Sequence, residues 1–429
     1  MKKEKQYEAI EKMMERVREA FRAEHKIARM FEKCISNTLD TTIKRDENGK
    51  IFVITGDIPA MWLRDSSCQL RPFLLFAKEE PEILEIICDL VKRQMECILI
   101  DPYANAFNES ANGNGFQDDR TEMKPELWER KYEIDSLCFP FQLSYQLWKN
   151  TGCTSQFDES WRKAAKRIVE VFRTEQYHEE KSPYYFERRN CVYTDTLSRG
   201  GKGALVKSGI GLIWSGFRPS DDACTYGYLI PSNMLASVVL SEMAQVSREV
   251  LEDEAFAAEA ENFSVEVRKA IEEYAIVPGH QKEFYAYEVD GYGQYNIMDD
   301  ANIPSLLAMP YIGYCKKNAE RYLNTREVIL SEWNPYYYSG SALQGIGSPH
   351  TPHSYVWMIA LCVQGLTSES REEKEKILEM VCNADAGTDL MHESVCKDDP
   401  EQYTRPWFSW ANSVFCEFVI DYLGDSVKM

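Results

Sequence analysis

The chain has 429 residues, of which 44% are hydrophobic and 12% aromatic, enough apolar surface to bury a large core. Its 49 Lys plus Arg against 69 Asp plus Glu give a formal net charge of −20, which argues against nucleic acid or an anionic membrane as a partner. The sequence has no run of 18 apolar residues and no signal-peptide pattern, and none of its 13 cysteines forms a CxxC pair. We therefore expect a cytoplasmic protein without a membrane span.

Apolar residues at helical spacing dominate the chain and predict a mainly α protein. The expected helices cover residues 6–33, 64–77, 81–98, 134–150, 158–173, 231–247, 253–273, 302–314, 318–331, 352–365, 370–382 and 408–422. Short strands are expected within the connecting loops at residues 52–54, 284–287 and 336–338.

The helices are joined by long segments rich in Gly, Pro, Asn and Asp, and no Ser/Gly/Pro-rich linker divides the chain. We therefore expect residues 1–429 to form a single catalytic domain, with residues 1–33 as an N-terminal helix. The helix count fits an (α/α)6 toroid, six helical hairpins around a central axis, and an open helical array fits the pattern almost as well. On either scaffold the long loops are where function is expected.

Several loop segments carry carboxylates beside aromatic and small residues. Arg64 and Asp65 stand together at the predicted start of a helix, where Asp can simply favour the first turn or the pair can hold a sugar diol. In residues 128–135, Glu129 and Glu133 have i, i+4 spacing, and a surface ion-pair network is the favoured interpretation of that segment alone. Each pattern on its own favours a structural role.

Residues 214–224, WSGFRPSDDAC, contain two adjacent acids among aromatic residues. Ser220 can cap the following segment, with Asp221 and Asp222 favouring a helix N-terminus. Alternatively the acids face an aromatic-lined cleft, where burial raises the pKa of a carboxyl as a general acid requires.

A metal site is not expected. His350 and His353 flank Pro352, which denies them a regular helical face, and the acids Asp299 and Asp300 are far away in sequence. We therefore predict neither a metal nor another cofactor.

Hydrolysis of a glycosidic bond needs two carboxyl groups across the scissile linkage, and the loops supply several. Spacing alone does not choose among the loop acids Asp65, Glu133, Asp221, Asp299 and Glu393. The Trp407/Trp410 pair that follows Glu393 can form a sugar-site wall or part of the core.

The segments TGDIPAMWLRDS, DPYANAFN, WERKYEIDSL, WSGFRPSDDAC, MDDANIPSLL, GIGSPHTP and the MHE of residues 391–393 together resemble glycoside hydrolase family 125, the exo-α-1,6-mannosidases. The resemblance runs from about residue 34 to about residue 420. It implies an (α/α)6 fold, inversion at the anomeric carbon, no metal, and an α-1,6-linked mannose oligosaccharide, such as an N-glycan fragment, as the bound partner. The sequence makes no prediction of oligomeric state.

The resemblance also assigns residues. The family's general acid falls on Asp221 and its general base on Glu393. The matching segments make Arg64, Asp65, Asn302 and His350 the first candidates for contacts to the terminal mannose, and Tyr103, Trp128, Trp214 and Arg218 the weaker ones.

Two other functions fit parts of the pattern. An inverting (α/α)6 hydrolase acting on an α-glucoside would carry similar acids and aromatics, and its substrate panel would differ. A non-catalytic sugar-binding protein could keep the fold, but it would be expected to have lost Asp221 or Glu393, and both are present.

Overall fold

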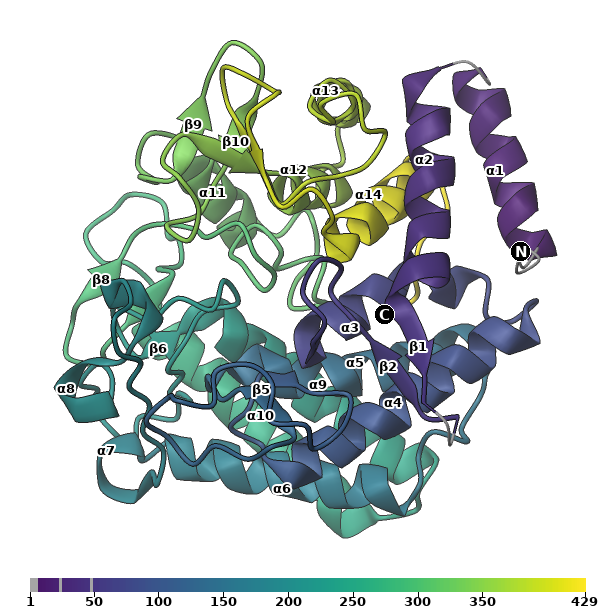
Figure 1. The fold of residues 1–429 in the computed structure, drawn as a ribbon. Helices are drawn as coiled ribbons and strands as arrows, with labels where there is room; N and C mark the ends of the chain where they lie inside the picture. Colours follow the sequence, from purple (N-terminus) through teal and green to yellow (C-terminus); the bar gives the residue numbers. More distant parts are fainter. Residues whose placement is uncertain (1–6, 23–24, 47–48) are drawn as a thin grey trace.

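Helices make up most of the regular structure of the computed structural model, which describes residues 7–22, 25–46 and 49–429 (Figure 1). In chain order the α-helices are α1 Glu8–Phe21, α2 Lys26–Asn37, α3 Leu63–Leu70, α4 Pro81–Ile100, α5 Ile134–Thr151, α6 Glu159–Glu175, α7 His178–Lys181, α8 Ser198–Gly201, α9 Ile230–Glu249, α10 Glu254–Tyr274, α11 Glu320–Ile329, α12 Met358–Leu366, α13 Arg371–Cys382 and α14 Ser409–Tyr422. None of the described helices is long and apolar enough to span a lipid bilayer.

The helices form two layers around a central axis. In the inner layer α3 packs on α5, α5 on α9, α12 on α14 and α14 on α3. The turn-rich segment 303–314 completes this layer: the carbonyl of Ile312 accepts from Gln142 of α5, and the hydroxyl of Tyr311 donates to Glu417 of α14. The outer helices α2, α4, α6, α10 and α13 pack against inner helices or against each other. This arrangement confirms the predicted (α/α)6 toroid.

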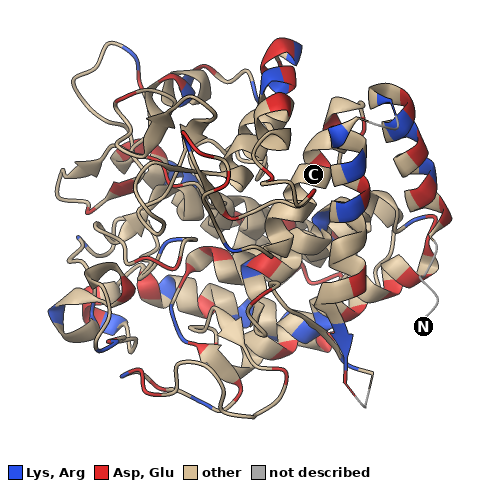
Figure 2. Ribbon diagram, turned by 45° about the horizontal axis from the view of Figure 1, so that its top comes forward, with Lys and Arg blue, Asp and Glu red and all other residues tan. Residues whose placement is uncertain are grey.

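Burial explains why the two layers have different sequences. Every residue of α9 from Ile230 to Leu240 is buried, because the helix is surrounded by protein. By contrast, α6 buries one apolar face that includes Trp161 and Ile168, and the carboxylate of Asp158 caps it by accepting from the Trp161 amide at 3.0 Å. The outer helix α1 is rich in charged residues, among them Glu8, Glu11 and Arg18, and charged positions recur along the outer helices in Figure 2.

Three small antiparallel sheets lead the chain into inner helices. Their strand orders are β3-β4-β5 (Met61–Trp62, Ala106–Phe107, Leu127–Glu129), β6-β7-β8 (Tyr228–Leu229, Glu288–Val289, Tyr295–Asn296) and β11-β12-β13 (Tyr355–Trp357, Ser394–Cys396, Tyr403–Thr404). Trp62 pairs with Ala106, Tyr228 with Val289 and Trp357 with Ser394. Because β3, β6 and β11 run directly into α3, α9 and α12, the loops of these sheets gather at the N-terminal ends of the inner helices.

Two further pairs complete the strands: β1 Ile43–Arg45 with β2 Ile51–Val53, and β9 Tyr337–Ser339 with β10 Gln344–Ile346. The strands predicted at 52–54 and 336–338 are thus present as β2 and β9. The strand predicted at 284–287 is reduced to an isolated bridge between Tyr285 and Ile276, just before β7.

The expected N-terminal helix over residues 1–33 is divided into α1 and α2. Arg22 has a φ of 67°, which ends α1, and the imidazole of His25 accepts from the Ile27 amide at 3.2 Å to begin α2. Residues 1–6 and 23–24 of that prediction lie outside the described residues.

The helix predicted over 302–314 is wrong, because this segment forms successive turns. Pro304 and Pro310 lack the amide hydrogen that a helix interior needs, and the Asp299 carboxylate takes the Leu306 and Leu307 amides at 2.8 and 3.0 Å. Similarly, α12 begins at Met358 and not at residue 352, because residues 355–357 pair with β12.

Candidate active site

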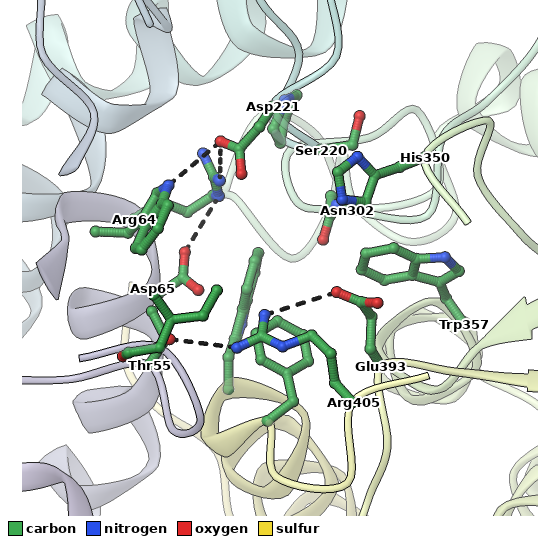
Figure 3. Close-up of a pocket in the computed structure, with 15 residues that line it drawn as sticks. Thr55, Arg64, Asp65, Ser220, Asp221, Asn302, His350, Trp357, Glu393 and Arg405 are labelled. Atoms are coloured by element: carbon green, nitrogen blue, oxygen red, sulfur yellow. Dashed lines mark hydrogen bonds and ion pairs between the residues drawn. The ribbon is translucent and has the colours of Figure 1, made fainter. Parts of the chain in front are cut away.

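A cavity of about 310 Å³ lies where the sheets run into the inner helices (Figure 3). Its apolar walls include Trp62, Trp357, Phe408 and Trp410. Its polar lining comprises Thr55, Arg64, Asp65, Ser220, Asp221, Asn302, His350, Glu393 and Arg405. Segments more than 300 residues apart in the chain therefore meet in one pocket, with the mixed lining that is typical of small-ligand sites.

Asp221 sits on a tight turn that aims its carboxyl group into the pocket. Its φ of 66° lies in the left-handed region, and its amide donates to the Arg218 carbonyl at 2.9 Å. The carboxyl oxygen Oδ1 accepts from Trp62 Nε1 at 3.3 Å, Arg64 Nη2 at 3.3 Å and Asn105 Nδ2 at 3.1 Å. Burial opposes ionisation of Asp221, but the Arg64 charge, a hydrogen bond with Glu133 and the charges of Lys131 and His350 hold its pKa below the usual range.

Arg64 is the central cation of the pocket floor. Its buried guanidinium lies within 4 Å of four carboxyl groups, those of Asp65, Glu133, Asp135 and Asp221. Burial raises the pKa of Asp65 to about 6, although Arg64 opposes that shift. Arg64 therefore fixes the acids on this side of the pocket relative to one another.

Glu393 stands at the entrance to β12, on the other side of the pocket from Asp221 (Figure 3). Its carbonyl accepts from the Met358 amide at 3.2 Å, and its own amide donates to the Thr404 carbonyl at 3.3 Å. These bonds tie Glu393 to the start of α12 and to β13. Its carboxyl oxygen Oε1 lies 3.6 Å from Nη1 of Arg405.

His350 and Asn302 line the pocket between the two acids in Figure 3. Nδ1 of His350 lies 3.1 Å from Oδ1 of Asp222. Burial alone would lower the pKa of His350, but the bond to Asp222 and the charges of Asp222, Glu393 and Asp221 together raise it to about 9. His350 is therefore a cation at neutral pH. Asn302 is buried, and its Oδ1 has no hydrogen-bond partner among the residues that the structure describes.

The structure brings six of the ten predicted site residues together in this pocket: Arg64, Asp65, Asp221, Asn302, His350 and Glu393. The other four lie elsewhere. The Tyr103 hydroxyl donates to Glu175 at 2.8 Å, and its ring stacks on Tyr184. Trp214 is fully buried and stacks on His178, with ring centroids 3.5 Å apart.

Trp128 and Arg218 lie close to the pocket without lining it. Trp128 packs edge-on against Phe116 and covers a small cluster that includes Trp62. Arg218 is buried in an ion pair with Glu288, with Nε and Oε1 2.6 Å apart, and borders a separate groove on the other side of the 218–224 turn. Trp214 and Arg218 thus share a loop with Asp221 but point away from the pocket, and the segments of Tyr103 and Trp128 contribute no side chain to its lining.

Arg405 and Trp357 line the pocket but were not predicted as site residues, and the sequence signal for Arg405 is its place shortly after Glu393. Of the Trp407/Trp410 pair, Trp410 is part of the pocket wall, one of the two expected roles, whereas Trp407 donates to Asn37 outside it. The favoured interpretation of Glu129 and Glu133 as an exposed ion-pair surface is wrong, because both are buried and only Glu133 contacts Arg64.

Within the described part of the chain, no three His, Cys, Asp or Glu side chains form a group suited to a metal ion. Three carboxyl groups line the pocket, and those of Asp221 and Glu393 lie on facing walls, with Arg64 beside the first and Arg405 beside the second. Acid–base cleavage of a glycosidic bond needs two carboxyl groups in such an arrangement.

The chain matches a family of metal-independent α-mannosidases, GH125, over residues 24–420. A Streptococcus pneumoniae protein of that description, solved in a non-productive complex with α-1,6-mannobiose, is 47% identical; the match covers 97% of this chain and 99% of that chain, with a TM-score of 0.94. The meiotically up-regulated gene 157 protein of Schizosaccharomyces pombe is 41% identical over 444 residues, covering 97% of this chain and 86% of that one.

More distant structures share the architecture alone. A bacterial glucoamylase complexed with acarbose is 10% identical with a TM-score of 0.55, over 86% of this chain and 49% of that chain. The family match over nearly the whole sequence, together with the two close relatives, agrees with the family that the motifs indicate. The chain therefore belongs to the metal-independent α-mannosidases of glycoside hydrolase family 125.

Proposed function

We propose that the chain is an exo-acting α-1,6-mannosidase that inverts the anomeric configuration, with Asp221 as general acid and Glu393 as general base. The observation that carries the proposal is that both carboxyl groups line one pocket, on facing walls in Figure 3. An inverting glycosidase needs one carboxyl to protonate the leaving oxygen and another to activate water on the opposite face of the sugar.

The remaining polar lining supports a subsite for one terminal mannose. Arg64 and Asp65 can donate to and accept from neighbouring hydroxyls, and His350 is a cationic donor. The unpartnered Oδ1 of Asn302 is a buried acceptor for another hydroxyl. The aromatic walls give the apolar face of the ring a packing surface.

The linkage is proposed from the Streptococcus pneumoniae relative, which was solved with α-1,6-mannobiose and whose family is linked to the processing of N-linked glycans. Because that relative is 47% identical over 97% of this chain, we propose the same linkage and an N-glycan fragment or manno-oligosaccharide as the substrate.

We also propose that this enzyme acts as one domain in a reducing compartment such as the cytoplasm. One continuous cluster of buried apolar residues extends from Tyr7 to Val427, which supports a single domain. All 13 cysteines are free, as expected where thiols stay reduced. Cell fractionation and titration of thirteen thiols per unfolded chain would test the location; a disulfide found in the native protein would contradict it.

A time course on a linear α-1,6-mannotriose tests the activity. From the trisaccharide, mannose and the shortened mannobiose should appear in equal amounts, and from a longer linear chain mannose should be the only mono- or disaccharide released early, because the proposed pocket admits one terminal sugar. A matched α-glucoside trisaccharide should stay intact. Early release of mannobiose from the interior of a longer chain, or faster cleavage of the glucoside, would overturn the proposal.

A further inference from the structure

The cluster around Arg64 contains more carboxyl groups than one guanidinium can neutralise. Nη1 lies 2.5 Å from Glu133 Oε2 and 3.0 Å from Asp135 Oδ2, while Nη2 lies 3.3 Å from Asp221 Oδ1. Asp65 is a fourth acid, 3.6 Å from Nε. The side chains of Glu133 and Asp135 are fully buried. Three buried carboxyl groups and the partly exposed carboxyl of Asp221 share this guanidinium and repel each other when ionised, which favours a retained proton within the cluster.

Hydrogen bonding indicates which carboxyl holds that proton. Asp221 Oδ1 accepts from three donors, and both oxygens of Asp135 are occupied, Oδ1 by Ser232 and Oδ2 by Arg64. Glu133 Oε2 accepts from Arg64 and from Ser136, whereas no donor in the described part of the chain reaches the buried Glu133 Oε1. An oxygen without a donor favours the protonated form of its carboxyl group.

A protonated Glu133 Oε1 needs an acceptor, and the Asp221 carboxyl supplies one. Burial, together with the charges of Asp221 and Asp135, raises the pKa of Glu133 far above its usual value, although Arg64 opposes the shift. The groups with the largest effect on the pKa of Glu133 are Arg64 of α3, Asp135 of α5 and Asp221 of the turn that carries the proposed acid, and Cys224 of that turn also faces it. Lys131 and His350 add positive charge beside Asp221.

We propose that Glu133 is a positioning residue that holds the catalytic proton for Asp221. In the empty site Glu133 is neutral and donates to the Asp221 carboxylate. When the glycosidic oxygen arrives, the proton passes from Glu133 to Asp221, leaving a Glu133 carboxylate bound to Arg64. Asp221 then gives this proton to the leaving oxygen as the C–O bond breaks, and Glu393 takes a proton from the attacking water. Release of the Glu393 proton and reprotonation of Glu133 restore the site.

This inference rests on the proposed acid role of Asp221, and it solves a difficulty of that role. A general acid must carry a proton at the working pH, whereas Asp221 is bound by a guanidinium and two further donors that favour its charged form. A neutral neighbour on the same guanidinium keeps a proton within one transfer of Asp221. It also explains why a buried glutamate lies beside an acid that it would otherwise repel.

The test compares Glu133→Gln with Asp135→Asn. Both substitutions remove a buried carboxyl beside Arg64, but only the first removes the proposed proton carrier. We expect Glu133→Gln to lower kcat on α-1,6-mannobiose about 10²-fold, with a much smaller loss on an aryl α-mannoside whose leaving group needs no proton. The alkaline limb of the pH profile of kcat should move to lower pH in Glu133→Gln, because Asp221 then titrates without a neighbouring proton carrier. Asp135→Asn should affect both substrates equally and move that limb less far, because it removes one charge that raises the pKa of Glu133 but keeps the proton carrier.

Equal losses on both substrates with an unmoved alkaline limb in Glu133→Gln would overturn the inference and leave Glu133 a purely structural residue. Should that variant fail to fold by circular dichroism, Glu133→Asp keeps a titratable group: it should retain the wild-type limb, and a displaced limb would count against the proposal. Asp221→Asn separates the two proposals, because full activity of that variant on mannobiose would remove the acid role itself.

Discussion

Nη1 of Arg405 lies 3.6 Å from Oε1 of Glu393, while Nε of the same guanidinium donates to Asp57 Oδ1 at 3.0 Å. Arg405 therefore connects the proposed base, Glu393, to Asp57 in the loop before α3, more than 300 residues away in the chain. A cation–π contact also holds the Arg405 side chain in place: its guanidinium carbon lies 4.3 Å from the centroid of the Phe408 ring.

We predict that Arg405→Met lowers kcat about 10- to 100-fold on both natural and aryl substrates, because an ionic contact worth about 1.5–3 kcal/mol that orients Glu393 is lost. The loss should not depend on the leaving group, since Glu393 acts on water. Steady-state kinetics check this, with Arg371→Met as a matched control, because Arg371 is an exposed arginine of α13. Unchanged kcat in Arg405→Met would show that Glu393 needs no such support.

Asp221→Asn should lower kcat on α-1,6-mannobiose by about 10²–10⁴-fold and spare an activated aryl mannoside, because the amide keeps the shape of the carboxyl but has no proton to give. Asp222→Asn is the matched control: it weakens the bond to His350 and should raise KM without that dependence on the leaving group. The reverse result, with Asp222 showing the dependence and Asp221 dispensable, would exchange the roles of these neighbours.

Helical periodicity predicted a mainly α chain, because outer helices such as α6 bury one apolar face. The long family motifs, and not the periodicity, favoured the toroid over an open helical array. The sequence could not predict which way a side chain points: Trp214 shares a motif with Asp221, yet its ring contacts lie in the core. The apolar spacing of residues 302–314 resembles that of a helix, which led to the wrong prediction. The segment forms turns because two prolines lack amide hydrogens and the Asp299 carboxylate accepts from the Leu306 and Leu307 amides.

The pKa of His350 gives a prediction for stability. Because it is raised from 6.5 to about 9, the protonated imidazole stabilises the fold fully below about pH 6.5, and this contribution is lost as the pH rises through about 9. The melting temperature of the wild type should therefore fall more between pH 6.5 and 9.5 than that of His350→Gln. His353→Gln serves as control and should follow the wild type. Parallel curves for His350→Gln and the wild type would contradict the assigned shift.

Activity should survive prolonged dialysis against a strong chelator, because acid–base catalysis by Asp221 and Glu393 needs no metal and the family is described as metal-independent. The check is kcat/KM before and after dialysis, with a zinc-dependent hydrolase treated in parallel as the positive control. A loss that calcium or zinc restores would require a metal site that the proposed mechanism does not contain.

The stereochemistry of the product tests the pairing of the two acids most directly. A water must fit between Glu393 and the anomeric carbon if inversion occurs, so a complex should show the carboxyl groups of Asp221 and Glu393 roughly 6.5–9.5 Å apart, against about 5–5.5 Å when one is a nucleophile. NMR taken before mutarotation should then show β-mannose as the first product. Glu393→Gln should abolish turnover even of an activated aryl mannoside, because the water still lacks a base, whereas Asp221→Asn should not. If α-mannose appears first, or if Glu393→Gln keeps its activity on the aryl substrate, then water is not activated by Glu393 and this pocket works by retention or with a different base.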